Sequence, residues 1–341
     1  MKTNDFAWYL STFLTKHLPG EKKLSANTIA VYRDSFKLFL IFCDSIKNMS
    51  PEKITLAMLT KPLILEYLEW IEKSRAGSAA TRNQRLSSIR GFVKFVQSES
   101  PDNLYELNRI LGIHPKRTAK TLVPYLIEND LKILFAQPDL KSKDGRRDYA
   151  LMTFMYDTAA RVQEIADLKM RHIRLAAPAV VTLHGKGDKT RQVPILDRTK
   201  NIITEYMDEQ KNLKWGMAFQ DMPVFFNQRR HPLSRWGISY ILGKYVSLAK
   251  QDPKFSADFP VTPHVLRHSK AMGMLKAGIN LIYIRDFLGH VNVTSTEVYA
   301  RADNEMKRKY LEHSYQDLNP QEFPNWEEDK TLLAWLNDLC R

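Results

Sequence analysis

The residues of this sequence that could do chemistry gather in a stretch of 36, from His264 to Tyr299. The stretch begins with His264-Val265-Leu266-Arg267-His268, and Leu288-Gly289-His290 precedes Tyr299, which stands nine residues after the last histidine. Arginine and histidine side chains can hold a phosphodiester through charge-assisted hydrogen bonds while a phenol attacks it. The set therefore predicts transfer of a phosphodiester onto Tyr299, which is the chemistry of cutting and rejoining DNA.

Thr262-Pro263 predicts the start of the helix that carries the first histidine, because threonine is a favoured N-cap and proline a favoured first helical residue. His264 then lies in the first turn, where free N–H groups favour an anion, and Arg267 and His268 share its face. Two alternatives are a capped helix with incidental polar residues and a metal site on the paired histidines. Metal is disfavoured, since Val265 replaces the glutamate of the H-E-x-x-H pattern and no third ligand is evident.

Two further positions indicate phosphodiester chemistry only in combination with the residues named above. Arg161 opens another expected helix, with Glu164 three residues on, and could cover the second non-bridging oxygen of a phosphate. Alone, it would more often be a surface ion pair with Glu164. Lys186 stands between two glycines and so has reach toward a backbone, although lysines in turns are ordinary. The chain has 14 tyrosines, so an isolated Tyr299 would usually be a packing residue.

The elements that must position these residues follow from the periodicity of apolar side chains. The first third of the chain repeats at helical spacing, and helical periodicity resumes near Glu128 and runs through Asp148–Thr158. Between the two helical parts of the second half, β-prone segments at 179–184 and 191–195 flank Gly185-Lys186-Gly187-Asp188-Lys189-Thr190. This predicts a hairpin with a glycine-rich tip. The three clearest early helices span residues 28–43, 62–73 and 81–97.

Charge and composition indicate a globular protein with a polyanionic partner. The net charge is +13 over 341 residues, with +8 on residues 1–120, +10 on 121–310 and −5 on 311–341. Basic surface on both halves fits DNA, since counterion release supplies affinity independent of sequence. Cys43 and Cys340 give neither a disulfide framework nor metal spacing. No apolar run could span a bilayer and no signal core is present, so a cytoplasmic protein without membrane contact is expected.

The order of these motifs resembles the tyrosine recombinase (phage integrase) family. That family shows an arginine near a helix start, a lysine in a β-hairpin, H-x-L-R-H, L-G-H and then a tyrosine nine residues later. All six positions are filled in the right order, over about residues 121–310. One departure is that Ala160 precedes the first arginine where the family usually has glycine, so a slightly altered turn is expected. The six matching residues are Arg161, Lys186, His264, Arg267, His290 and Tyr299.

The resemblance implies a mainly helical fold with a small antiparallel β-sheet. Residues 1–113 would form a helical core-binding domain, 114–124 a linker, 125–310 an α+β catalytic domain and 311–341 a tail. It also implies a clamp of the two domains on duplex DNA and a tetramer on paired recombination sites. The tail carries an apolar helical face among acidic residues, and would dock on a neighbouring protomer rather than on its own domain.

The resemblance also implies the roles of the site residues. Tyr299 would be the nucleophile of a 3′-phosphotyrosyl intermediate, Lys186 the general acid for the leaving 5′-oxygen, and His264 the group that accepts or relays the tyrosine proton. Arg161, Arg267 and His290 would bind the phosphate, while Glu164 and His268 would orient them. Neither a metal, ATP nor any other cofactor is required. Candidate DNA contacts are Arg82, Arg85, Arg90, Lys116, Arg117, Lys120, Arg229, Arg230 and Arg235.

Several other functions share part of this pattern. A type IB topoisomerase uses the same chemistry on one strand, but the docking tail and the short helical first domain argue against it. A DNA-binding repressor would explain the charge and leave the six-residue set unexplained. Among recombinases, integration, excision or transposition of a mobile element is the first expectation, and resolution of chromosome dimers is the second.

Overall fold

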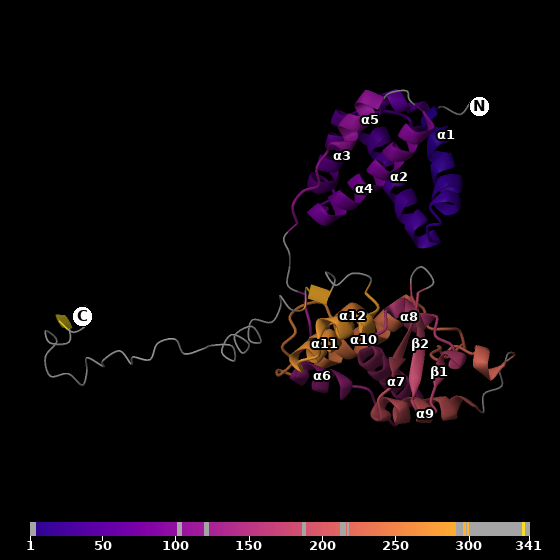
Figure 1. Cartoon of the computed structure of the whole chain (residues 1–341), viewed down its shortest axis with the longest axis vertical. Helices are drawn as coiled ribbons and strands as arrows, with labels where there is room; N and C mark the ends of the chain where they lie inside the picture. Colours follow the sequence, from indigo (N-terminus) through magenta and orange to yellow (C-terminus); the bar gives the residue numbers. More distant parts are fainter. Residues whose placement is uncertain are drawn as a thin grey trace. The chain divides into compact units, whose positions relative to one another are not determined.

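The computed structural model describes residues 5–100, 104–118, 123–185, 189–211, 216, 218–290, 296–297, 299 and 336–337. The chain divides into two compact units, Met1–Thr121 and Leu122–Arg341, and the division falls within residues 114–124, where the sequence predicts a linker. The described residues are mostly helical, with one small antiparallel sheet in the second unit (Figure 1). The predicted fold class is thereby confirmed.

The first unit consists of helices around an aromatic core. Phe36 and Phe39 of α2 meet Phe92 of α4 and Tyr67 of α3, with edge-on ring pairs at centroid distances of 5.1 and 5.3 Å. Phe36 and Phe39 belong to the apolar stripe that helical periodicity predicts for residues 28–43, and aromatic pairs in this arrangement stabilise the core beyond their burial. The elements of this unit are α1 (Asp5–Thr12), the π-helical η1 (Phe13–Glu21), α2 (Ala26–Lys47), η2 (Pro51–Lys53), η3 (Leu56–Met58), α3 (Lys61–Lys73), α4 (Ala79–Glu99) and α5 (Leu104–Leu111).

Local sequence fixes where the predicted helices begin and end. The hydroxyl of Thr60 accepts from the N–H of Leu63 before α3, and the hydroxyl of Ser78 accepts from the N–H of Thr81 before α4. At the end of α2, Asn48 takes the left-handed conformation that asparagine tolerates. The three predicted early helices lie inside α2, α3 and α4, which confirms those predictions.

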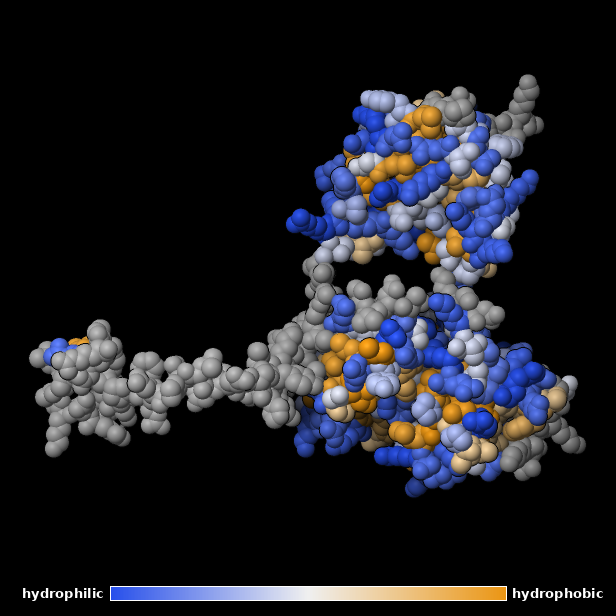
Figure 2. Space-filling model, viewed as in Figure 1, coloured by the Kyte–Doolittle hydropathy of each residue, from blue (hydrophilic) through white to orange (hydrophobic). Residues whose placement is uncertain are grey.

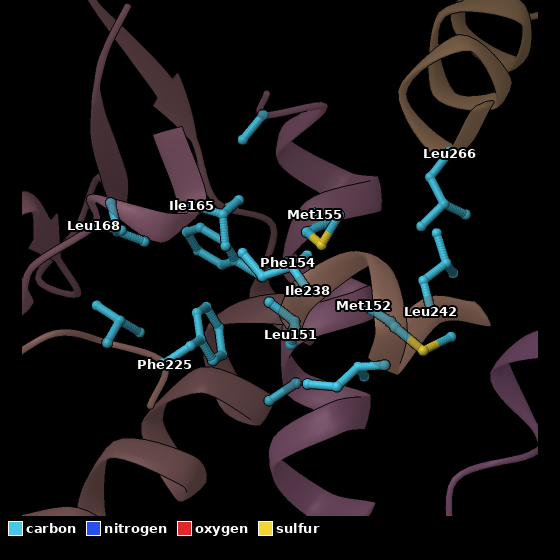
Figure 3. Close-up of a cluster of buried hydrophobic side chains, with 14 of the residues drawn as sticks. Leu151, Met152, Phe154, Met155, Ile165, Leu168, Phe225, Ile238, Leu242 and Leu266 are labelled. Carbon is cyan, nitrogen blue, oxygen red and sulfur yellow. The ribbon is translucent and has the colours of Figure 1, made fainter. Parts of the chain in front are cut away.

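The second unit packs helices and a three-stranded sheet around the central helix α7 (Figure 3). Leu151, Met152, Phe154 and Met155 of α7 point into a core that also receives side chains from α8, α10 and α11. The elements are α6 (Glu128–Phe135), α7 (Lys143–Thr158), α8 (Val162–Ala166), η4 (Met170–His172), β1 (Ile173–Arg174), β2 (Val180–His184), β3 (Thr190–Pro194), α9 (Asp197–Lys211), η5 (Phe219–Asp221), α10 (Arg235–Ala249), α11 (Pro263–Lys276) and α12 (Leu281–Leu288).

Strands β2 and β3 form the predicted hairpin. They pair antiparallel with Val181 opposite Val193 and His184 opposite Thr190, which sets the register up to the glycine-rich tip. Val181, Leu183 and Val193 are buried, so one face of the hairpin anchors to the core of the unit. Residues 186–188, at the tip itself, lie outside the described part of the chain.

The first residues of the predicted linker are held by the first unit. The N–H and carbonyl of Lys116 bond the side chain of Asn83 at 2.9 and 2.8 Å, and its ammonium group lies 2.7 Å from Glu72.

Hydrophilic residues cover most of the face seen in Figure 2, between smaller hydrophobic patches. Across the described residues, no helix has both the length and the apolar character needed to cross a membrane.

Candidate active site

Helix α11 begins where the sequence predicts, with Thr262 as the N-cap and Pro263 as the first helical residue. His264 is exposed in the first turn, and its ring centroid lies 6.4 Å from that of His268, one turn on. Arg267 points inward instead and is only 3% exposed. Helix α11 therefore exposes the imidazole of His264 to solvent and buries the guanidinium group of Arg267.

Arg267 ties together the ends of two helices. Its guanidinium donates to the carbonyl of Ala159 after α7 at 2.6 Å and to that of Leu288, at the end of α12, at 2.5 Å. Burial, and then the nearby charges of Arg161 and Arg191, lower the pKa of Arg267 to about 9, which leaves it charged at neutral pH. A buried cation held by carbonyl groups alone retains its charge to neutralise an anion.

Arg161 binds the same turn from the other side. Its guanidinium donates to the carbonyl of Gly289 at 3.0 Å and to the carboxylate of Glu164 at 2.9 Å. In the turn before it, Ala159 adopts a left-handed backbone with φ of 46°. Both arginines of the predicted set are therefore fixed on consecutive carbonyl groups at the end of α12.

Glu164 also binds an arginine that the sequence analysis did not single out. Arg191 of β3 donates to both oxygens of the Glu164 carboxylate, at 2.7 and 2.8 Å, and to the carbonyl of Phe287 at 3.1 Å. Burial alone would raise the pKa of Glu164, but the hydrogen bonds and charges of Arg191 and Arg161 outweigh it, so the pKa is lowered. The carboxylate therefore orients two guanidinium groups at once.

A cavity of about 510 Å³ opens over this cluster. Arg161 and His290 line it together with the base of the hairpin, so the structure brings three of the predicted motifs to one place. Lys186 lies outside the described residues, but its neighbour Gly185 is part of the lining. Four lining side chains, those of Lys189, Thr190, Arg191 and Asp286, were not predicted. The full lining is Arg161, Gly185, Lys189, Thr190, Arg191, Asp286, Gly289 and His290.

The imidazoles of the site are held neutral. Burial lowers the pKa of His268 and of His290 to about 4, and the charge of Arg267 adds to the effect on both. The pKa of His264 is lowered as well, by burial and then by Arg267 and Arg161. Each ring therefore has one donor and one acceptor nitrogen at neutral pH.

Tyr299 is buried beside the arginines and bonds a different histidine from the one expected. Its hydroxyl lies 2.8 Å from Nδ1 of His268, while its side chain is 1% exposed and packs with Ala159 and Leu288. Burial raises the pKa of the phenol, although Arg267 and then Arg161 oppose this. The motifs predicted that His264 would accept or relay the tyrosine proton, whereas the observed hydrogen-bond partner of the phenol is His268, one helical turn further on.

The candidate DNA contacts separate into buried and exposed groups. Arg82 is only 6% exposed and its guanidinium pairs with Glu72, which places it inside the first unit, against its predicted position on a DNA-facing surface. Arg85 is half-buried and donates to the hydroxyl of Ser35 at 2.9 Å. Lys120 lies outside the described residues. Arg90 lines a groove of about 480 Å³ with Lys94. Exposed candidates are Lys116, Arg117, Arg229, Arg230 and Arg235.

Among the residues whose structure is described, no group of three or more histidine, cysteine or acidic side chains could hold a metal ion. Positive charge in the described part of the site includes Arg161, Arg191, Arg267 and Lys189.

Comparison with known proteins identifies two matching family models. The model of the phage integrase family matches residues 124–306, and the model of the phage integrase N-terminal SAM-like domain matches residues 12–100. Together they cover most of both compact units. The matched residues 124–306 include all six positions that the sequence analysis selected.

Named relatives match along most of their length. The chain is 30% identical to y4rC of Sinorhizobium fredii, described as a putative integrase/recombinase, over 97% of each chain. It is 31% identical to the tyrosine recombinase XerC of Bacillus licheniformis, over 89% of this chain and 95% of the relative.

Solved structures share the fold at lower identity. The XerH site-specific recombinase in a post-cleavage complex with its palindromic difH substrate gives a TM-score of 0.67 at 18% identity, over 85% of this chain and 80% of XerH. The Tn1549 transposon integrase in complex with transposon right end DNA gives 0.65 at 17% identity, over 89% of this chain and 99% of the integrase.

Proposed function

This chain belongs to the phage integrase family and is a tyrosine recombinase; from that premise we propose that it cuts and rejoins specific DNA sites through a 3′-phosphotyrosyl intermediate. The observation that carries the proposal is the pair of guanidinium groups on one turn. Arg161 and Arg267 donate to the carbonyls of Gly289 and Leu288, next to His290 and beside the buried Tyr299. Donors fixed before the substrate arrives stabilise developing negative charge without reorganisation.

The reaction would proceed by two transesterifications. The oxygen of Tyr299 forms a bond to phosphorus, the bond from phosphorus to the 5′-oxygen breaks, and Lys186 gives a proton to that oxygen. The 5′-hydroxyl of a partner duplex then attacks the phosphorus and returns its proton to Lys186, the bond from phosphorus to the Tyr299 oxygen breaks, and the phenol recovers its proton. Because the ester bond is conserved in the covalent intermediate, neither ATP nor hydrolysis is needed.

We propose that His268 receives the tyrosine proton, with His264 as the group that binds or relays at the mouth of the site. The contact of 2.8 Å between the phenol and Nδ1 of His268 supports this assignment. In the free protein the transfer is unfavourable, since burial raises the pKa of Tyr299 and lowers that of His268 to about 4. A bound phosphodiester offsets the charge of Arg267 and so makes His268 a stronger base.

The oligomer is a further part of the proposal. We propose a tetramer on two synapsed duplexes, linked through residues 311–341, whose net charge is −5. A cavity of about 530 Å³ between α6, α7 and α9 suits the apolar helical face of such a segment, because Leu131, Phe135, Tyr149 and Tyr156 line it. Truncation before residue 321 should leave DNA binding intact and abolish joining of two duplexes.

For the biological setting we propose a mobile element. The relative that aligns over 97% of both chains is described as a putative integrase/recombinase, while the XerC relatives make a chromosomal site the alternative. Sequencing the DNA captured covalently by the protein decides between them: captured sites at the two ends of an element support the first, and one chromosomal site supports the second.

The proposed function is tested by covalent capture on a nicked duplex that traps the cleaved state. Wild-type protein should form an adduct that survives EDTA and joins to the 3′ end of the cleaved strand, and Tyr299→Phe should form none. Joining of two labelled duplexes separates a recombinase from a topoisomerase. Tight DNA binding without any adduct, in both full-length protein and protein truncated before residue 321, would leave only a binding role.

A further inference from the structure

The ring of His290 contacts Thr296, a residue that belongs to none of the predicted motifs. The hydroxyl of Thr296 lies 3.0 Å from Nδ1 of His290. Thr296 is fully buried, with 0% exposure, and stands three residues before Tyr299. His290 also lines the cavity with Arg161, so the contact with Thr296 affects how His290 can meet a phosphate there.

A neutral imidazole can donate from one nitrogen only. Phosphate oxygens are acceptors, so His290 helps a phosphodiester only when the nitrogen that faces the cavity carries the proton. Nδ1 is already engaged by the buried hydroxyl, which leaves Nε2 for the cavity. A hydroxyl that donates to Nδ1 makes it the acceptor and therefore keeps the proton on Nε2.

We propose that Thr296 is a positioning residue that holds His290 with its Nε2–H toward the scissile phosphate. The inference rests on the proposed function, because it assigns His290 to the phosphate. It adds a specific requirement for a hydroxyl at a position between His290 and Tyr299. Thr296 itself touches neither the substrate nor the reacting atoms.

The alternative is that Thr296 only fills space in the packed interior around Tyr299. The two roles differ in what the hydroxyl does, and valine matches threonine in shape but lacks that hydroxyl. A packing role predicts that Thr296→Val leaves the chemistry intact. A positioning role predicts a loss that Thr296→Ser, which keeps the hydroxyl and removes the methyl group, largely reverses.

The experiment measures single-turnover cleavage of a nicked duplex by full-length protein. Thr296→Val should lower the cleavage rate roughly ten-fold, as expected for loss of one orienting hydrogen bond, and Thr296→Ser should restore most of it. Thr204→Val is a matched control, since this helical threonine only donates to the carbonyl of Lys200. Cleavage by Thr296→Val at the wild-type rate would overturn the proposal.

A second readout does not depend on DNA. Long-range proton–nitrogen correlation of His290, in protein with labelled histidine, should show a protonated Nε2 and an acceptor Nδ1 in the wild type. In Thr296→Val the Nδ1 resonance should move toward that of a ring without this hydrogen bond. Identical spectra would contradict the inference. If wild-type protein formed no adduct on any DNA while the spectra changed as expected, the proposed function would fail and the Thr296 contact would stand.

Discussion

Glu164 and Arg191 form a two-point ion pair between α8 and β3, with both carboxylate oxygens accepting from the guanidinium group at 2.7 and 2.8 Å. The side chain of Glu164 is 2% exposed and that of Arg191 12%. Because Glu164 also binds Arg161, this pair connects the β-hairpin to the proposed phosphate-binding residues. The geometry of the site therefore depends on a residue that has no role in the predicted chemistry.

Removal of Arg191 should both destabilise the catalytic unit and slow cleavage. Arg191→Met leaves a buried carboxylate with half of its partners, which costs about 3 kcal/mol of unfolding free energy. Urea unfolding measures the loss. Arg171→Met is the matched control, since Arg171 pairs with Asp221 at the surface, and such pairs contribute at most about 1 kcal/mol. Equal losses of unfolding free energy in the two variants would show that the buried pair stabilises the protein no more than the surface pair does.

The bond between Tyr299 and His268 should be measurable as a coupling energy. In a double-mutant cycle of Tyr299→Phe and His268→Phe, the free energies of unfolding should give a coupling energy of about 1 kcal/mol, the usual net value of one buried hydrogen bond. The corresponding cycle with His264→Phe should give a coupling energy near zero, because His264 has an exposed position and no bond to the phenol. Stronger coupling of Tyr299 to His264 than to His268 would reverse the assignment of the two histidines.

Stability should fall with acid because of the site histidines. The pKa of His268 and of His290 is about 4 in the folded protein, below the value of about 6.5 for an unfolded chain. The unfolded state therefore binds more protons between these values, so stability is complete above about pH 6.5 and declines as the pH falls toward about 4. Unfolding midpoints across this window should decline less in His290→Asn than in the wild type.

The DNA-contact candidates should separate by salt dependence. Arg90→Ala should reduce the slope of log affinity against log salt by about 1, as expected for one lost phosphate contact. Arg82→Ala should leave the slope unchanged and lower the stability of the first unit, since Arg82 is buried against Glu72. Binding titrations of a duplex at several salt concentrations, with thermal unfolding of each variant, measure both effects. A slope change for Arg82 with unaltered stability would restore it as a DNA contact.

The motif residues could be predicted because their local structure is determined by near neighbours. Thr262-Pro263 sets the start of α11, and the spacing of Arg267 and His268 then follows from the helix. Likewise the hairpin follows from alternating strands around a glycine-rich tip. The two-residue strand β1 was not predicted, because it is too short to show any periodicity.

Long-range partners could not be predicted. Arg191 is separated from Glu164 by 27 residues, and no local pattern distinguishes it from an ordinary solvent-facing strand residue. Arg82 lies mostly off the apolar stripe of its helix, yet it is buried and pairs with Glu72 of α3. The contact of Tyr299 with His268 rather than with His264 is a tertiary contact between distant residues, which spacing alone does not determine.

The short stretch from Thr296 to Tyr299 touches two different imidazoles, one with a hydroxyl and one with a phenol. Any event that withdraws the phenol from His268 therefore also loosens the hold on His290. Thermodynamic reciprocity requires the reverse as well, so a phosphate that tightens His290 retains the nucleophile in place. In each subunit, binding of the phosphate by His290 and placement of the Tyr299 phenol would therefore be thermodynamically coupled, so that a change in one changes the other.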